Sequence, residues 1–446
     1  MNLWSITPCR YGGLSARCGA ITVPENRAVA HGRTIVLHFV ALPARKKPAR
    51  EPLFGIAGGP GQAAIEGFEG DAKDVSARYP DRDILLEDQR GTGTSHPLRC
   101  NIYPTDAVTY EALFPLEIIR ACRASLARDS DLNAYGTDAA ADDLNDTRKA
   151  LGYKKIVMWG GSYGTSVALV YLRRHEASVA AELLEGVAPP WLLPPLPFPR
   201  GAQAALDDLA RSCTGDADCS TAFPRFSKEF EALIARAKTG IPVAGGTIKF
   251  EVLTDRMRQA MYDTYTASYI PLIVRRWAGG DAAPLAKLVA RLSHGIPGAL
   301  AMGMSLSVTC SESLPFITPA DAVRESTGTF MGDARYRAQR AACQVWNVKP
   351  VSRTFVAPIR SNVPVLMVGG AADPATPPRF GAEELAYLPN GRQILVPHAG
   401  HDFASPCVDK IEEAFISTYQ TKTLDASCLV SAGRPAFKTD FKGLTK

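Results

Sequence analysis

Several features that mark common classes of protein are missing from this sequence of 446 residues. It has no run of about 18 uninterrupted apolar residues, so we expect no membrane-spanning helix. No basic stripe is interleaved with aromatic residues, and the net charge of +5 is small for this length, which argues against a dedicated nucleic-acid binder. Internal repeats and long low-complexity segments are also absent. The hydrophobic content of 46% supports a large globular core.

None of the ten cysteines forms a Cys-x-x-Cys motif with a matching second pair or with histidines, so no zinc site is expected. Their number is even, and we predict that neighbours in sequence pair as five local disulfides in a secreted or periplasmic protein. Buried free thiols in a cytosolic enzyme are the alternative. The predicted pairs are Cys9–Cys18, Cys100–Cys122, Cys213–Cys219, Cys310–Cys343 and Cys407–Cys428.

The first residues, Met1-Asn2-Leu3-Trp4, do not begin a signal peptide, because no apolar segment follows a basic start. We interpret Met1 as an addition to a mature chain.

Apolar runs of strand length alternate with helix-like segments, which predicts a doubly wound, mostly parallel α/β sheet with an antiparallel start. Helices are expected at 138–151, with Gly152 as the C-terminal stop, at 166–175 and at 411–419. The predicted strands are 19–23, 34–41, 53–57, 83–86, 155–159, 181–185, 363–368 and 393–396.

This alternation breaks after Val187, where a proline-rich linker cannot continue a helix or a central strand. From Gly201 to about Ser352 the pattern is mostly helical, and we predict a helical cap over the C-terminal edge of the sheet. The expected organisation is a core in two parts, 1–190 and 353–446, with a helical cap or lid at 191–352. Predicted cap helices are 203–213, 226–238, 254–263, 272–277 and 284–292.

Gly160-Gly161-Ser162-Tyr163-Gly164 lies between a strand-like run and a helix-like run. In that context a serine flanked by glycines is typical of a sharp strand-to-helix turn that exposes the hydroxyl of a nucleophile. A glycine-rich turn with an ordinary serine is the simpler interpretation. We predict that Ser162 is a nucleophile.

A serine nucleophile needs a base, and the base needs an orienting acid. His398 and His401 follow the last predicted strand, where a loop reaches the serine across the top of the sheet, and we favour His401 over His398. For the acid we favour Asp373, which follows a buried strand and a loop of small residues; Glu185, at the end of another strand, is the competitor. If these residues have no catalytic role, Asp373 is a helix N-cap or turn residue, and either histidine is a polar loop residue.

The oxyanion of a tetrahedral intermediate needs backbone N–H donors. Tyr163 directly follows the predicted nucleophile, and Gly58-Gly59-Pro60-Gly61 follows an earlier strand. Because Pro60 has no N–H, we predict Gly59 and Tyr163 as the donors. The Gly-x-Gly-x-x-Gly and P-loop patterns are absent here, so no nucleotide, metal or other cofactor is expected.

Together these motifs resemble the α/β-hydrolase family that includes prolyl aminopeptidases and tripeptidyl aminopeptidases. The family's oxyanion loop is similar to Gly58 to Gly61, and its nucleophile turn is similar to Gly161 to Gly164. Its motif after the next strand is similar to Asp88-Gln89-Arg90-Gly91-Thr92-Gly93. Asp373 and Gly400-His401 match its acid and base, and Cys18 and Cys407 resemble the exported tripeptidyl-aminopeptidase-like branch. The family's histidine before the oxyanion loop is Ala57 here, outside the triad.

The resemblance implies an acidic residue in the cap that binds the substrate's N-terminal ammonium. Glu312, beside Cys310, is the candidate for this residue. The alternative is that Glu312 is a structural or solvated glutamate. We also expect Asp88 and Arg90 to form a structural ion pair under the active site.

The sequence therefore predicts a serine hydrolase that releases N-terminal residues or short peptides, with a preference for proline near the scissile bond as one option. Its partner is a peptide or small acyl substrate. A carboxylesterase or amide hydrolase on the same scaffold, and a non-catalytic hydrolase fold used for binding, are the alternatives.

Overall fold

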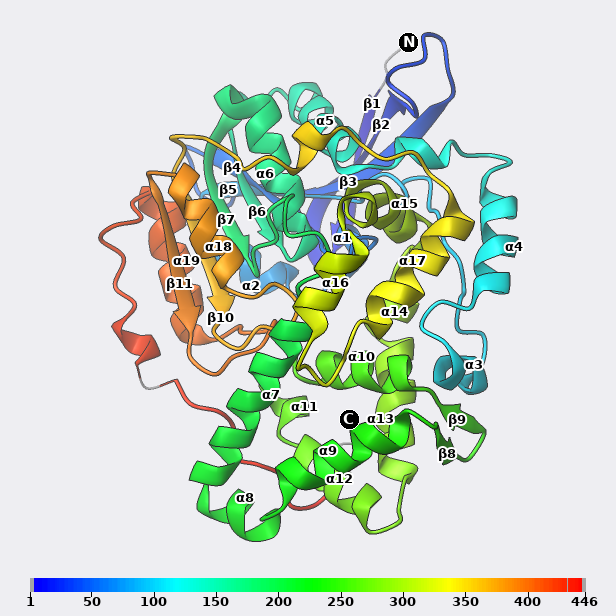
Figure 1. Ribbon diagram of the computed structural model, residues 1–446. Helices are drawn as coiled ribbons and strands as arrows, with labels where there is room; N and C mark the ends of the chain where they lie inside the picture. The colour runs from blue at the N-terminus through cyan, green and yellow to red at the C-terminus, as the bar shows by residue number, and fades with distance from the viewer. Residues whose placement is uncertain (1–3, 431, 443–446) are drawn as a thin grey trace.

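The centre of the molecule is a nine-stranded sheet with the order β1-β2-β3-β5-β4-β6-β7-β10-β11 (Figure 1). This computed structural model describes residues 4–430 and 432–442. The strands β1, β2, β3 and β5 pair antiparallel, and from β5 to β11 all pairs are parallel, so the predicted antiparallel start and mostly parallel sheet are confirmed. The strands are β1 (Trp4–Tyr11), β2 (Leu14–Pro24), β3 (Thr34–Leu42), β4 (Arg50–Ile56), β5 (Arg82–Glu87), β6 (Ile156–Gly161), β7 (Val179–Glu185), β10 (Val365–Gly370) and β11 (Gly391–Val396).

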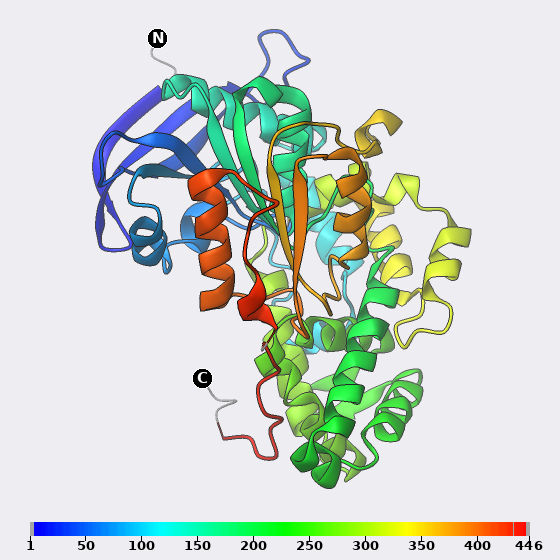
Figure 2. The same cartoon turned by 90° about the vertical axis from the view of Figure 1, so that its left-hand side faces the viewer.

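Helices cover both faces of this sheet, as continuous apolar strands require. In β6, Ile156 and Met158 face one hydrophobic core, and Val157 faces a second core on the opposite side. Helices α5, α6 and α18 lie on the first side, and α2 and α19 on the second (Figure 2). The helices outside the later insertion are α1 (Ala64–Gly67), α2 (Ala72–Arg78), α3 (Asp106–Glu111), α4 (Leu116–Leu126), α5 (Thr137–Ala150), α6 (Tyr163–His175), α18 (Arg379–Glu384) and α19 (Pro406–Thr418).

Between β7 and β10 the chain is mostly helical, and it includes one small hairpin, β8 (Ile241–Val243) with β9 (Gly246–Ile248). This insertion also contacts earlier helices, because α4 packs on α17 and α3 packs on α13 and β9. Its helices are α7 (Phe198–Gly215), α8 (Ala217–Ala222), α9 (Phe226–Ala237), α10 (Phe250–Ala260), α11 (Thr264–Ala267), α12 (Ile270–Ala278), α13 (Ala283–His294), α14 (Ile296–Ala299), α15 (Met302–Glu312), α16 (Pro319–Ser326) and α17 (Ala334–Trp346).

All five predicted disulfides form with the predicted partners. Five disulfides favour an extracellular or periplasmic protein, because the cytosol keeps thiols reduced. Among the described helices, none combines the length and apolar character that crossing a membrane requires.

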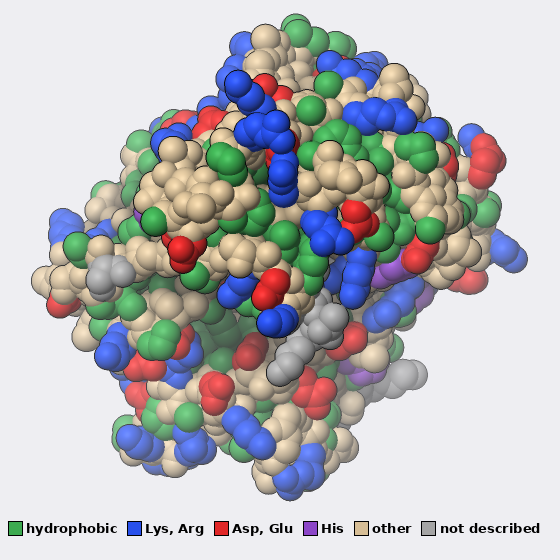
Figure 3. Space-filling model, turned by 90° about the horizontal axis from the view of Figure 1, so that it is seen from below, with side chains coloured by type: hydrophobic (Ala, Val, Ile, Leu, Met, Phe, Trp, Pro, Cys, Tyr) green, Lys and Arg blue, Asp and Glu red, His purple; other side chains and the backbone are tan. Residues whose placement is uncertain are grey.

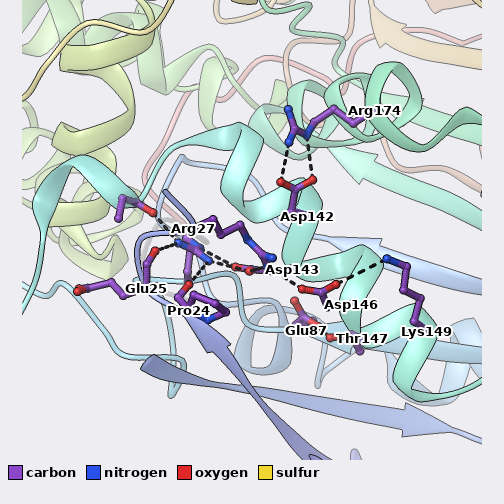
Figure 4. A network of polar contacts seen from close by, with 12 residues as sticks. Pro24, Glu25, Arg27, Glu87, Asp142, Asp143, Asp146, Thr147, Lys149 and Arg174 are labelled. Atoms are coloured by element: carbon purple, nitrogen blue, oxygen red, sulfur yellow. Dashed lines mark hydrogen bonds and ion pairs between the residues drawn. The ribbon is translucent and has the colours of Figure 1, made fainter. Parts of the chain in front are cut away.

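The expected ion pair between Asp88 and Arg90 is wrong. Arg90 instead forms two hydrogen bonds with Asp143 on α5, of 2.6 and 2.7 Å. Figure 4 shows that Arg27 joins the same carboxylate. The carboxylate of Asp88 accepts backbone N–H groups from Ile65 and Thr94. The motif around Arg90 therefore holds the loop after β5 against α5, a contact between segments that spacing along the chain does not reveal.

Candidate active site

Ser162 lies in a strained turn between β6 and α6. Its φ and ψ angles are 54° and −123°, a conformation that non-glycine residues rarely adopt. The glycines beside it permit this turn: a Cβ on Gly164 would lie 2.3 Å from the carbonyl oxygen of Ile56, and one on Gly160 would lie 2.5 Å from that of Gly164. The Ser162 backbone N–H donates to the Glu185 carbonyl oxygen at 2.8 Å, which fixes the turn to β7.

Asp373 and His401 come together from the loops after β10 and β11. The distance from His401 Nδ1 to Asp373 Oδ2 is 2.7 Å. The other carboxylate oxygen of Asp373 accepts the backbone N–H groups of Ala375 and Thr376, so Asp373 also has the turn role that its sequence context allowed. The Thr376 hydroxyl donates to Asp373 Oδ2 at 2.6 Å. These contacts hold the carboxylate in one orientation toward the imidazole.

The same contacts set the protonation of the pair. Burial alone would raise the pKa of Asp373, but the charge of His401 and the hydrogen bonds from His401 and Thr376 lower it below its ordinary value. Burial would lower the pKa of His401, but Asp373 raises it above 6.5. The pair is therefore an ionised carboxylate beside an imidazole whose second nitrogen, Nε2, is free to exchange a proton.

The glycine-rich loop after β4 lies directly beside Ser162. A Cβ on Gly58 would lie 2.9 Å from the Cβ of Ser162. Gly59 and Tyr163 both line a cavity that contains Ser162. Tyr163 is the first residue of α6, where the backbone N–H has no acceptor within the helix. The glycine-rich loop and the start of α6 thus line the same cavity as the serine.

Two cavities meet at Ser162. The first lies under the insertion and is lined by Gly59 and Tyr163 from the sheet side and by residues of α7, α10, α15 and α17. The second opens beside α2 and α19 and is lined by Gly58, Gly161 and His401. Ser162 lines both, so a bound molecule can extend from the serine in two directions.

The two competing residues lie elsewhere. His398 has Nδ1 3.2 Å from the carboxylate of Asp208 on α7. Glu185 accepts a hydrogen bond from the Trp159 indole at 3.1 Å and lies beside Glu412. Burial, together with Glu185, raises the pKa of Glu412 well above its ordinary value. Neither His398 nor Glu185 has a hydrogen bond to the pair formed by Asp373 and His401.

Glu312, at the end of α15, lines the cavity under the insertion. Its two carboxylate oxygens accept the backbone N–H and the hydroxyl of Thr137, each at 2.6 Å. The Thr137 hydroxyl is also 2.8 Å from the Tyr163 hydroxyl. Burial raises the pKa of Glu312 to about 7, although the Thr137 hydrogen bonds oppose this shift. Glu312 is thus a buried carboxyl that titrates near neutral pH on the wall of the cavity.

Two residues of this site were not predicted from the sequence. Thr376 bonds Asp373, and the Tyr262 ring lies 5.0 Å from the His401 ring, centre to centre. Thr376 follows Asp373 by three residues, a spacing at which a hydroxyl reaches back to a turn carboxylate. Tyr262 has no such signal, because it comes from the insertion, more than a hundred residues away in the chain. Within the described residues, no three His, Cys, Asp or Glu side chains are grouped as metal ligands would be.

Comparisons with known proteins concern the family and the fold of the chain. A family profile described as alpha/beta hydrolase fold matches residues 53–217, and one described as TAP-like protein matches 328–428. The serine protease Hip1 of Mycobacterium tuberculosis is 24% identical, covering 95% of this chain and 90% of that protein. Tripeptidyl aminopeptidase of Streptomyces lividans is 25% identical, covering 92% and 83%. Proline iminopeptidase of Neisseria gonorrhoeae is 26% identical over only 34% of this chain and 37% of that protein.

Proposed function

Because the chain belongs to the α/β-hydrolase family of prolyl and tripeptidyl aminopeptidase-like serine peptidases, we propose that it is a serine aminopeptidase. It removes single residues or short peptides from the free N-terminus of a peptide. The observation that carries this proposal is the hydrogen bond of 2.7 Å between Asp373 and His401, with His401 lining a cavity that Ser162 also lines.

The reaction begins when Ser162 Oγ attacks the scissile carbonyl carbon while His401 Nε2 accepts the hydroxyl proton. Asp373 holds the imidazole in the tautomer that carries its proton on Nδ1, and stabilises the imidazolium. The N–H groups of Gly59 and Tyr163 bind the negative oxygen of the tetrahedral intermediate. His401 then protonates the leaving amine, the C–N bond breaks, and water releases the acyl group from Ser162 by the same steps.

Glu312 supplies the preference for a free N-terminus. It is a buried carboxyl on the same cavity as Ser162 and Tyr163, and an ammonium group beside it favours the ionised form. Thr137 fixes its orientation through two hydrogen bonds. The α-ammonium of the substrate would therefore lie under the insertion, on the acyl side of the scissile bond.

The five disulfides support a place of action outside the cytoplasm, in the periplasm or beyond the cell. Peptide mapping without reductant, on protein isolated from its native host, tests this: the five bridges are expected, and ten free thiols would contradict it.

The activity is tested with paired chromogenic substrates that share one leaving amine. The panel holds aminoacyl, dipeptidyl and tripeptidyl amides, each with a free and an acetylated N-terminus, with proline or alanine next to the scissile bond, and the matching esters. We expect the free amides to react and the acetylated ones to react poorly. Equal rates on both forms would overturn the aminopeptidase assignment, and turnover of esters alone would indicate a carboxylesterase.

A further inference from the structure

Three arginine side chains gather on one wall of the cavity under the insertion. Arg256 and Arg258 come from α10 and Arg335 from α17, and all three line the cavity. The Arg256 and Arg258 side chains are almost completely buried, and the Arg335 side chain is 18% exposed. The figure of 18% matters because it makes Arg335 the least buried of the three side chains that line the cavity.

A single carboxylate, that of Asp255, joins the three guanidinium groups. It lies 2.8 Å from Arg256, 3.0 Å from Arg258 and 3.2 Å from Arg335. The remaining hydrogen bonds of the cluster go to neutral groups: Arg256 to Ser293 and Tyr103, Arg258 to Tyr262, and Arg335 to Gln339. Within the described part of the chain, Asp255 is the only acidic residue in ion-pair contact with these arginines, so the cluster holds two more positive charges than negative ones.

An excess of buried positive charge is costly, because each ion loses its hydration. Aromatic faces offset part of this cost: Arg258 lies 4.1 Å from the centre of the Phe198 ring, and Arg335 lies 4.9 Å from that of Phe114. Burial nevertheless lowers the pKa of Arg335; Asp255 raises it, and the neighbouring arginines lower it further. Among the described residues no second carboxylate forms an ion pair with the cluster, and Arg335, its least buried member, lines the cavity.

The other carboxyl group on this cavity does not fill that role. Within the described residues, Glu312 forms no ion pair with Arg256, Arg258 or Arg335, and its oxygens accept hydrogen bonds from Thr137. The cluster is instead close to the reacting centre, since Arg258 donates to the Tyr262 hydroxyl at 2.5 Å and the Tyr262 ring lies against His401. A substrate group that reaches the arginines therefore belongs to the part of the substrate that lies under the insertion.

We propose that Arg256, Arg258 and Arg335 form a subsite for a side-chain carboxylate, that of an aspartate or glutamate, on the acyl part of the substrate. This inference rests on the proposed function, because the acyl part is assigned to this cavity through Gly59, Tyr163 and Glu312. His401, which protonates the leaving amine, lines the other cavity. Arginine suits the task, because its planar fork binds a carboxylate through two parallel hydrogen bonds.

A binding measurement tests the subsite without relying on turnover. The Ser162→Ala protein is titrated by calorimetry with free tripeptides that differ only in Glu or Gln at one position, each position being tried in turn. We expect the glutamate peptide to bind about tenfold more tightly at one position. In a Ser162→Ala/Arg335→Gln protein this preference should disappear, and Arg335→Lys should restore part of it. Ser162→Ala/Arg340→Gln is the matched control, because Arg340 is exposed on the same helix.

Equal affinity for the Glu and Gln peptides at every position, or a preference that survives Arg335→Gln, would overturn the subsite. Kinetics of the unmodified enzyme separate this result from a failure of the proposed function. If free N-terminal peptides are cleaved with no Glu preference, the aminopeptidase assignment stands and the subsite fails. If no peptide is cleaved but the Ser162→Ala protein still prefers glutamate through Arg335, the subsite stands and the assigned reaction fails.

Discussion

The two cavities that meet at Ser162 carry opposite charges. The cavity under the insertion is lined by three arginines and by one carboxyl group, Glu312, whose pKa is near 7. The cavity beside α2 and α19 is lined by one arginine, Arg78, and by six acidic residues: Asp71, Asp74, Glu185, Asp402, Asp409 and Glu412. On the exposed face seen from below, by contrast, Lys and Arg side chains are interspersed with Asp and Glu (Figure 3).

This difference gives the site a direction. A substrate whose acyl part is held under the insertion would extend its leaving part past His401 into the acidic cavity. The potential there favours leaving peptides that carry positive charge, whereas the arginine wall favours negative charge on the acyl part.

Replacing Ser162 with alanine should abolish turnover of every substrate, because Ser162 lines both cavities and supplies the one nucleophile. We expect kcat to fall by about a million-fold on every substrate, whatever its charge. Stopped assays with a chromogenic peptide measure the loss, and labelling by a fluorophosphonate probe should disappear in parallel. Retained labelling at another serine would show that the nucleophile is misassigned.

The Asp373→Asn variant should bind substrate in both cavities as before but should no longer transfer the proton efficiently. The amide no longer holds the His401 tautomer, so kcat should fall by about 10⁴-fold while KM changes little. Glu185→Gln is the comparison, because Glu185 lines the acidic cavity but accepts its hydrogen bond from the Trp159 indole, whereas His401 bonds Asp373. A larger loss of kcat in Glu185→Gln than in Asp373→Asn would reverse the choice of acid.

Glu312→Gln should act on the acyl side only. KM for free N-terminal substrates should rise about 10- to 100-fold, as expected for the loss of a charge-assisted hydrogen bond. Because the pKa of Glu312 is about 7, KM of the unmodified enzyme should also rise as pH falls below that value, where the carboxyl becomes neutral. In the variant, KM should no longer change with pH in this range. A KM that stays low in Glu312→Gln would assign Glu312 a purely structural role.

Removing charge from the acidic cavity should have the smallest effect. Asp71→Asn/Asp74→Asn should lower kcat/KM a few-fold for peptides with Lys or Arg in the leaving part, and added salt should shrink the difference, because these side chains are exposed. Glu231→Gln, an exposed change on α9, is the control. A loss on leaving groups of either charge would argue against an electrostatic cause.

In the proposed site, the sequence carries a signal for those parts that depend on local chain geometry. Ser162 is marked by the glycines of its turn, Asp373 and His401 by loops that follow buried strands, and the disulfides by pairing of neighbours in sequence. The edge strand β1 was not predicted, because most of its residues are exposed and give no apolar pattern.

Contacts between distant segments were not predictable in the same way. The partner of Arg90 is Asp143 rather than Asp88, and Tyr262 reaches His401 from the insertion. The arginine wall joins α10 to α17, which are separated by more than seventy residues. Helical periodicity places Arg256 and Arg258 in the predicted helix 254–263 but does not say which helices pack together.

The most direct test of the central claim is the mass of the acyl-enzyme. The unmodified protein is mixed with a decapeptide that has a free N-terminus, quenched in acid within milliseconds, and weighed intact. We expect an adduct on Ser162 whose mass equals the first residue, or the first two or three residues, and no adduct with the acetylated decapeptide. An equal adduct with the acetylated peptide, or one that extends beyond a tripeptide, would contradict the assignment of the ammonium group and the acyl part to the cavity under the insertion.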